Sequence, residues 1–331
     1  MNHAAWDMDE LFRVWTFCMY SKLCNFAKTI ISNMKKKVLA IINPISGTGN
    51  KEKLPRLIEN QLDHDAMDVS VAFTEHPGHA HDMALQAVAS GAHCVIAIGG
   101  DGTVNEVASA LRDTSTVLAI IPVGSGNGLA RHLRLPMNTA RALQVVNEWH
   151  YDAFDYCTVN DRPFFCTCGV GFDAQVSFRF AQEGTRGFIT YVKTTLNEFF
   201  HYKAQTYHID IDGQQMEEKA MVIAGCNAAQ YGNNAFIAPR VTMQDGLIDL
   251  TVLHRFNMAG AALLGARLFT RSIDRDRHIS IYRGKHIVIE RDHDDVMHID
   301  GDPVMMPARL ELVCHHHGIH VMLEPRNNVQ L

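Results

Sequence analysis

The 331-residue sequence lacks several features that identify common protein classes. Its eight cysteines form no CxxC pair and no spacing typical of a zinc site or a disulfide framework, which favours a reducing cytoplasm. No run of about 18 apolar residues occurs, so no transmembrane span is expected. Acidic residues (36) outnumber Lys and Arg (30), and the formal charge of -6 argues against a nucleic-acid partner.

The two common nucleotide-binding fingerprints are also missing. The chain contains neither the GxxxxGK[ST] spacing of P-loop NTPases nor a clean GxGxxG followed by an acidic partner. These absences disfavour a P-loop NTPase and a simple Rossmann dehydrogenase. Hydrophobic residues nevertheless make up 47% of the chain, which is enough for sizeable cores, and the length predicts two domains.

Short β-branched segments alternate with helical segments in the first half of the chain, which predicts a parallel α/β sheet. The strands are expected at 38–42, 69–73, 95–98 and 117–121, and the helices at 51–62, 79–89, 103–111 and 127–133. This alternation stops near residue 150. Period-2 segments then predict a β-rich second domain, with strands at 207–211, 248–252, 287–289 and 310–312.

Three of the four strand-to-helix turns are rich in glycine: residues 43–49, 99–103 and 124–128. The carboxyl ends of parallel strands meet at one edge, where each following helix offers free N–H groups and a positive dipole end. Glycine lets the backbone come close to an anion, so the three turns predict a polyphosphate site. Asp101 would repel such a ligand unless it held a divalent cation or accepted a proton, as phosphoryl transfer requires.

The same turns carry a resemblance to a known family. Asn43-Pro44 with Ser46-Gly47, then residues 99–106 and 122–131, resemble the diacylglycerol kinase catalytic domain family, which includes bacterial lipid kinases and sphingosine kinases. The resemblance runs from about residue 36 to residue 324, and its later blocks are residues 169–174, 245–249 and 300–302. The GGDGT block alone would be weaker evidence, because NAD kinases and 6-phosphofructokinases carry similar turns.

The resemblance implies a nucleotide-binding α/β domain of the NAD kinase and diacylglycerol kinase type, with a parallel sheet, followed by an antiparallel β-rich sandwich domain. We expect an N-terminal extension at 1–34, an ATP-binding domain at 35–150, a lipid-substrate domain at 151–320 and a tail at 321–331 that returns to the first domain. The extension is either a misassigned start upstream of Met34 or an amphipathic segment.

The implied activity is ATP-dependent phosphorylation of a lipid hydroxyl, with ATP and Mg2+ in the cleft and diacylglycerol as the default acceptor. A sphingoid base or another lipid is the alternative acceptor; an NAD kinase and a non-catalytic lipid-binding relative are further alternatives. Asp101 and Asp302 are the expected catalytic residues, and Asp101 and Asp245 the expected metal ligands. The expected nucleotide contacts are Asn43, Pro44, Ser46, Gly47, Thr74, Gly99, Gly100, Gly102, Thr103, Glu106, Gly124, Ser125, Gly126 and Asn127.

Two positions depart from the family pattern. Many bacterial members have Asn-Asp at the end of the third turn, whereas Asn127 is followed here by Gly128, so one expected carboxylate is missing. Asp302 stands where glutamate is common in the family. Its shorter side chain can act as a base only if the backbone or the substrate restores hydrogen-bond reach.

Three further segments have alternative interpretations. The basic segment 265–291 fits either a solvated surface or an anionic membrane, and the apolar stripe 188–199 fits either core packing or an acyl pocket. The histidines at 315–317 are expected at the surface or on an edge strand, because adjacent strand residues point to opposite faces and no carboxylate completes a metal site. We expect a cytoplasmic protein that touches the inner membrane face, and a homodimer stays open.

Overall fold

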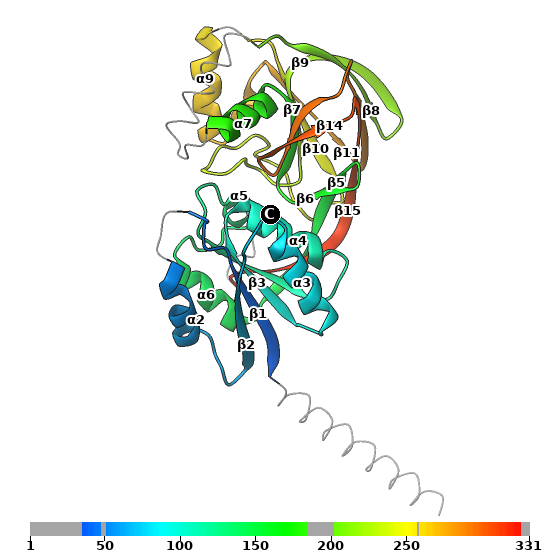
Figure 1. Ribbon diagram of the computed structural model, residues 1–331. Helices are drawn as coiled ribbons and strands as arrows, with labels where there is room; N and C mark the ends of the chain where they lie inside the picture. Colours follow the sequence, from blue (N-terminus) through cyan, green and yellow to red (C-terminus); the bar gives the residue numbers. More distant parts are fainter. Residues whose placement is uncertain (1–34, 48–50, 184–201, 257, 326–331) are drawn as a thin grey trace, which may run out of the picture.

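The computed structural model describes residues 35–47, 51–183, 202–256 and 258–325 (Figure 1). The expected N-terminal extension and the apolar stripe 188–199 lie outside the described residues, as does the end of the tail.

The N-terminal domain is a parallel sheet flanked by helices, as predicted (Figure 1). Its strands are β1 (Lys36–Ile42), β2 (Met67–Phe73), β3 (Cys94–Gly99) and β4 (Val117–Pro122), in the order β4-β3-β1-β2. Its helices are η1 (Lys51–Lys53), α2 (Leu54–Gln61), α3 (His79–Ala89), α4 (Asp101–Leu111), α5 (Gly128–His132) and α6 (Thr139–Glu148). Every residue of β3 and β4 is buried, because a sheet with helices on both faces leaves no face to water.

Two hydrophobic cores lie on the two faces of this sheet. Ala80, Ala84 and Val107 of α3 and α4 pack in one core, and Ile58 and Leu143 of α2 and α6 pack in the other. Helix α6 was not among the segments expected from the sequence. Its N-terminus is capped by the side chain of Asn138, which accepts a hydrogen bond from the amide of Arg141.

The C-terminal domain is built mainly from antiparallel strands around a third core, as predicted. Its strands are β5 (Tyr151–Val159), β6 (Arg162–Phe164), β7 (Thr167–Gly171), β8 (Gln205–Ile211), β9 (Gln214–Cys226), β10 (Ile248–His254), β11 (Ile279–Gly284), β12 (His286–Glu290), β13 (Asp295–Ile299), β14 (Asp302–Met306) and β15 (Arg309–Met322). Its helices are α7 (Phe172–Glu183), α9 (Met258–Phe269) and η2 (Ile273–Arg275). The four period-2 segments expected from the sequence correspond to β8, β10, β12 and β15.

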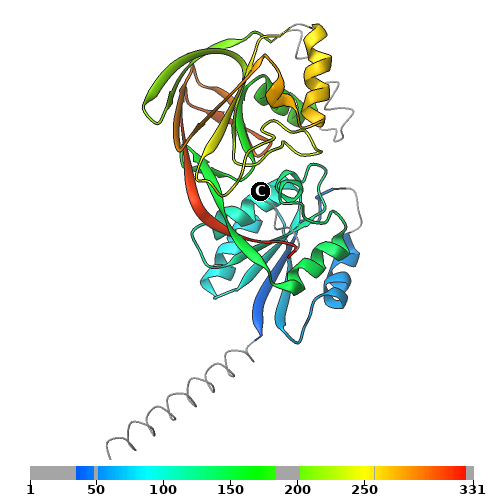
Figure 2. The same ribbon diagram turned by 180° about the vertical axis from the view of Figure 1, so that it is seen from behind.

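Strands β5 and β15 lie side by side and together connect the two domains (Figure 2). They pair antiparallel from Leu312 to Met322, with an irregularity between His315 and Ile319. At its end β15 pairs in parallel with β4, through Val321 and Leu118. The last strand therefore reaches the first sheet, while the domain boundaries given above stay predictions.

Candidate active site

The three glycine-rich turns pack directly against one another at the carboxyl edge of the parallel sheet. Gly47 has a φ of +62°, and a Cβ there would overlap the carbonyl oxygen of Val123. A Cβ on Gly124 would overlap the Cα of Gly100 in the same way. Only glycine fits at these contacts, so the turns that were expected to bind phosphate also require glycine for their own packing.

Asp101 joins the second turn to the third. Helix α4 begins at Asp101, two residues earlier than expected, so this carboxylate lies in the first helical turn. Its Oδ2 accepts a hydrogen bond from the amide of Asn127 at 2.9 Å, and its Oδ1 accepts one from the amide of Gly128 at 2.6 Å. Burial, and then the negative charge of Asp300, raise the pKa of Asp101, although the two amides act in the opposite direction.

Several of the predicted nucleotide contacts are buried within these turns. Thr103 accepts a hydrogen bond from the Asn43 side chain at 2.9 Å and fills the space that a side chain on Gly99 would need. The hydroxyl of Ser46 accepts a long hydrogen bond of 3.4 Å from the amide of Gly100. Thr74 is buried as well. The predicted contacts that are exposed to solvent are Pro44, Gly47, Gly102 and Ser125.

Glu106 has a structural partner that the sequence did not indicate. Its two carboxylate oxygens accept hydrogen bonds from the amides of Gly78 at 2.9 Å and Ala80 at 3.1 Å. These amides belong to the start of α3, where a negative charge is favourable. Glu106 therefore holds α3 against α4, and its predicted contact with the nucleotide stays a prediction.

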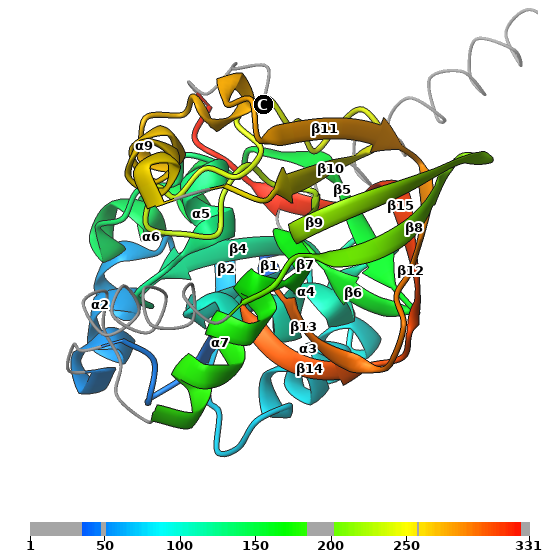
Figure 3. The same ribbon diagram turned by 90° about the horizontal axis from the view of Figure 1, so that it is seen from above.

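Asp302 approaches α4 from the other domain. Seen from above, β13 and β14 lie over α4 (Figure 3). A Cβ built on Gly102 would lie 3.5 Å from Oδ2 of Asp302. Desolvation by the surrounding protein raises the pKa of Asp302, and the negative charges of Asp300, Asp101 and Glu106 raise it further. Asp302 nevertheless remains exposed to solvent. Within the described part of the chain its carboxylate accepts no hydrogen bond.

Asp300 is the residue of this site that sequence reasoning missed. Its carboxylate accepts hydrogen bonds from the amides of Phe165, Cys166 and Thr167, at 2.8 to 3.0 Å, and from the side chain of Asn105 in α4, at 2.8 Å. Through Asn105 this side chain connects the C-terminal domain to α4 of the N-terminal domain. Burial raises the pKa of Asp300, although these four hydrogen bonds act in the opposite direction. The block 300–302 was the available signal, but it did not reveal these partners.

Gly128 stands at one of the two positions that depart from the family pattern. A Cβ there would lie 3.4 Å from both Cys166 Sγ and the carbonyl oxygen of Gln230, at the short limit of ordinary van der Waals contact. The amide of Gly128 also donates to Asp101. The third turn is thus linked to Asp101 through the backbone amide of this residue, which adds no carboxylate of its own.

Asp245 belongs to a different part of the structure from Asp101. Its Oδ2 accepts a hydrogen bond from Arg283 at 3.0 Å, and its Oδ1 accepts one from the amide of Leu247. Arg283 also donates to Asp249, at 2.6 Å. The structure therefore does not bring the two predicted metal ligands together, and a metal role for Asp245 stays a prediction.

The basic segment 265–291 is only partly neutralised within the fold. Besides the pairs made by Arg283, Arg267 forms an ion pair with Asp276 at 2.7 Å, and buried Arg291 donates to four backbone carbonyl oxygens. By contrast, Arg271, Arg275 and Arg277 are exposed and form no ion pair among the described residues, so positive charge at the surface remains. Among the described residues, no helix is long and apolar enough to cross a bilayer.

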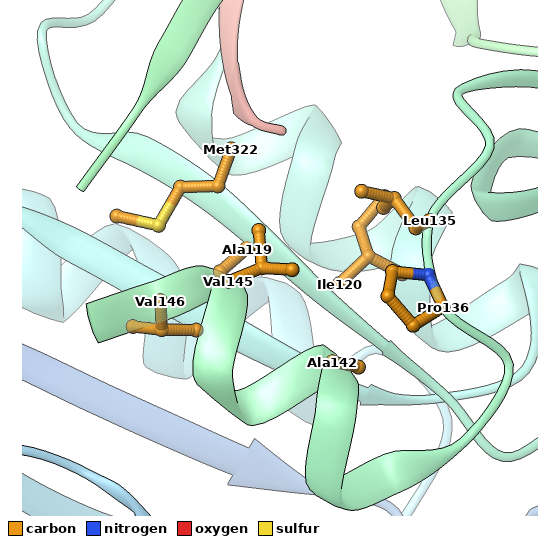
Figure 4. Close-up of a pocket in the computed structure, with 8 residues that line it drawn as sticks. All are labelled: Ala119, Ile120, Leu135, Pro136, Ala142, Val145, Val146 and Met322. Atoms are coloured by element: carbon orange, nitrogen blue, oxygen red, sulfur yellow. The ribbon is translucent and has the colours of Figure 1, made fainter. Parts of the chain in front are cut away.

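Figure 4 shows a pocket that lies away from the glycine turns. It is enclosed by apolar side chains of β4 and α6 and by the end of β15. Its lining residues are Ala119, Ile120, Leu135, Pro136, Ala142, Val145, Val146 and Met322. This set contains no titratable group, so the pocket is a packing feature of the first domain and is separate from the carboxylates.

Comparisons with known proteins agree with this arrangement. Residues 37–159 match the model of the diacylglycerol kinase catalytic domain, and residues 166–319 match that of the YegS C-terminal NAD kinase beta sandwich-like domain. An uncharacterized protein from Synechocystis sp. is 29% identical over 76% of this chain, and the match spans 61% of that protein's length. A diacylglycerol kinase from Mycobacterium tuberculosis is also 29% identical, over 65% of this chain and 72% of its own length.

The fold has a counterpart among solved structures. A diacylglycerol kinase structure from Bacillus anthracis aligns with a TM-score of 0.68 and 23% sequence identity, and covers 88% of this chain and 97% of that chain. The two family models occur in chain order and together match most of the present sequence. The protein therefore belongs to the diacylglycerol kinase family of lipid kinases.

Proposed function

We propose that this protein transfers the γ-phosphoryl group of ATP to a lipid hydroxyl, with diacylglycerol as the acceptor and phosphatidic acid as the product. The observation that carries the proposal is the approach of Asp101 and Asp302, from the two domains, at the N-terminus of α4. The glycine turns and helix ends on one side favour a triphosphate. The lipid acceptor would enter from the side of Asp302, at the cytoplasmic surface of a membrane.

The acidic side chains of the site fit a magnesium ion. The pKa values of Asp101, Asp300 and Asp302 are all raised, and in Asp101 and Asp302 the neighbouring negative charges contribute to this. A divalent cation would offset that repulsion, and Mg2+ prefers such oxygen ligands together with phosphate. Asp101 would hold the ion together with the ATP phosphates. The ion would there neutralise the negative charge that develops on the phosphate oxygens during transfer.

Asp302 is the proposed general base. Its carboxylate is free of hydrogen bonds among the described residues and keeps contact with solvent, and its raised pKa favours proton acceptance. It would take the proton of the acceptor hydroxyl while the hydroxyl oxygen bonds to the γ-phosphorus. The bond from that phosphorus to the β–γ bridging oxygen breaks, and ADP leaves. Asp101 keeps the third turn in place through the amides of Asn127 and Gly128.

The test is phosphate transfer from labelled ATP in the presence of Mg2+ to separate vesicles that contain diacylglycerol, a sphingoid base or monoacylglycerol. A parallel reaction contains NAD in solution. We expect labelled phosphatidic acid, and we expect Asp302→Asn to reduce its formation by roughly 10²- to 10⁴-fold, as for a lost general base. Asp302→Glu, which keeps the carboxylate, should retain measurable activity.

The other outcomes distinguish the alternatives. Labelled phosphate in the sphingoid base would support a lipid kinase with a different acceptor. Labelled phosphate in NAD would reject the proposal of a lipid kinase. ATP binding without transfer to any acceptor would favour a non-catalytic lipid-binding protein. Transfer by Asp302→Asn at the wild-type rate would reject Asp302 as the base.

A further inference from the structure

Strand β15 departs from regular pairing where it connects the two domains. Its register with β5 shifts between His315 and Ile319, and His317 has a φ of +54°. In a regular strand, neighbouring side chains point to opposite faces. Here the rings of His316 and His317 instead stack, with their centroids 3.7 Å apart, and both residues are exposed. The two histidines lie at the surface, as expected, but the premise that adjacent histidines point to opposite faces does not hold at this bulge.

The carboxylate that the sequence did not reveal comes from β5. Asp155 is fully buried, and its Oδ1 lies 2.8 Å from Nδ1 of His316. The ligand atoms of Asp155, His316 and His317 all lie within 4.8 Å of one another. The amides of Gly246 and His317 donate to the Asp155 carboxylate, at 2.7 and 2.8 Å, and hold it in place. Two imidazoles and an oriented carboxylate thus converge at the protein surface.

We propose that Asp155, His316 and His317 bind a divalent transition-metal ion of the zinc class. Two imidazole nitrogens with one carboxylate suit Zn2+, Co2+ or Ni2+, whereas Mg2+ and Ca2+ prefer oxygen ligands alone. An ion bound at Nδ1 of His316 would take the place of the hydrogen bond between His316 and Asp155. The exposed histidines leave the remaining coordination positions to water.

This site is separate from the proposed kinase chemistry. None of its three residues belongs to the glycine turns or to the carboxylates around α4. Strands β5 and β15 connect the domains, so an ion bound to residues of both strands would stabilise the bulge at this connection. The inference therefore stands whether or not the protein phosphorylates a lipid.

The experiment uses the full chain, freed of metal with EDTA and then dialysed. Zn2+ is titrated in a calorimeter, and Co2+ is followed through its visible absorption. The variants are His316→Gln and His317→Asn; asparagine tolerates the positive φ of residue 317. The matched control is His286→Gln, because His286 pairs with Glu311 at 2.7 Å in an exposed pair that has no third ligand in the described part of the chain.

We expect one Zn2+ site that is weakened at least ~10-fold in both variants, since loss of even an outer contact commonly costs that much. The control should bind Zn2+ as the wild type does, and Mg2+ should not compete. Any Zn2+ binding by the histidines that are common to all four proteins is the same in each, so it cancels in the comparison of affinities. Equal melting temperatures in EDTA would show that the variants are folded. Unchanged Zn2+ affinity in both variants, an equal loss in the control, or competition by Mg2+ would overturn the proposal.

Discussion

The substitution Asp300→Asn separates the structural role of Asp300 from the proposed chemical role of Asp302, two residues away. Each carboxylate oxygen of Asp300 accepts two hydrogen bonds: Oδ1 from the amides of Cys166 and Thr167, and Oδ2 from the amide of Phe165 and the side chain of Asn105. Asparagine keeps one acceptor oxygen. Whichever oxygen it replaces, its NH2 group faces two donors that have lost their partner.

Two buried donors without partners cost roughly 1–3 kcal/mol each, so the gross loss is about 2–6 kcal/mol. Burial raises the pKa of Asp300, so its negative charge is itself unfavourable in the folded protein, and the neutral amide recovers part of the loss. We therefore expect the lower part of that range, about 2–3 kcal/mol. This corresponds to a fall in melting temperature of roughly 4–8 °C.

The assay is thermal unfolding of wild type, Asp300→Asn and the control Asp302→Asn at neutral pH, with phosphate transfer measured at a temperature where all three are folded. The control removes a carboxylate that accepts no hydrogen bond among the described residues, so its melting temperature should match or slightly exceed the wild-type value. Its transfer rate should fall. If Asp300→Asn melts at the same temperature as the wild type, the four hydrogen bonds of Asp300 do not stabilise the fold and the reasoning is refuted.

Three further predictions concern the glycine turns, α3 and the proposed base. Gly126→Ala should weaken ATP binding measured by calorimetry, because a Cβ there would lie 2.6 Å from Oδ2 of Asp101; Gly265→Ala, which has nothing within 4 Å, is the control and should bind normally. Glu106→Ala leaves the amides of Gly78 and Ala80 unpaired, and because Gly78 is only half-buried, water can replace part of the loss. Stability in denaturant unfolding should therefore fall by about 1–3 kcal/mol, and equal stability would contradict this. If charged Asp302 is the base, its raised pKa means that kcat/KM should fall with decreasing pH at a pH above the ordinary aspartate range. Asp302→Asn should not show this fall.

The sequence alone predicted the secondary structure and the order of the domains well. The strands expected at 38–42, 95–98 and 117–121 lie within β1, β3 and β4, and the antiparallel domain follows near residue 150. Such elements depend on short-range hydrophobic periodicity, and the glycine turns depend on local backbone geometry. Both can therefore be predicted from the sequence. The order of the turns also sufficed to identify the family, which the domain matches confirmed.

Only the tertiary structure decided which side chains converge. Asp300 meets Asn105 across 195 positions of sequence, and His316 meets Asp155 across 161. The first contact depends on how β13 and β14 lie over α4, and the second on a bulge that places two adjacent histidines on one side of β15. Periodicity specifies which face of a strand is buried, but it contains no information about a bulge or about the register between distant strands. For that reason Asp101 and Asp302 could be proposed from their motifs, whereas Asp300 and the histidine site could not.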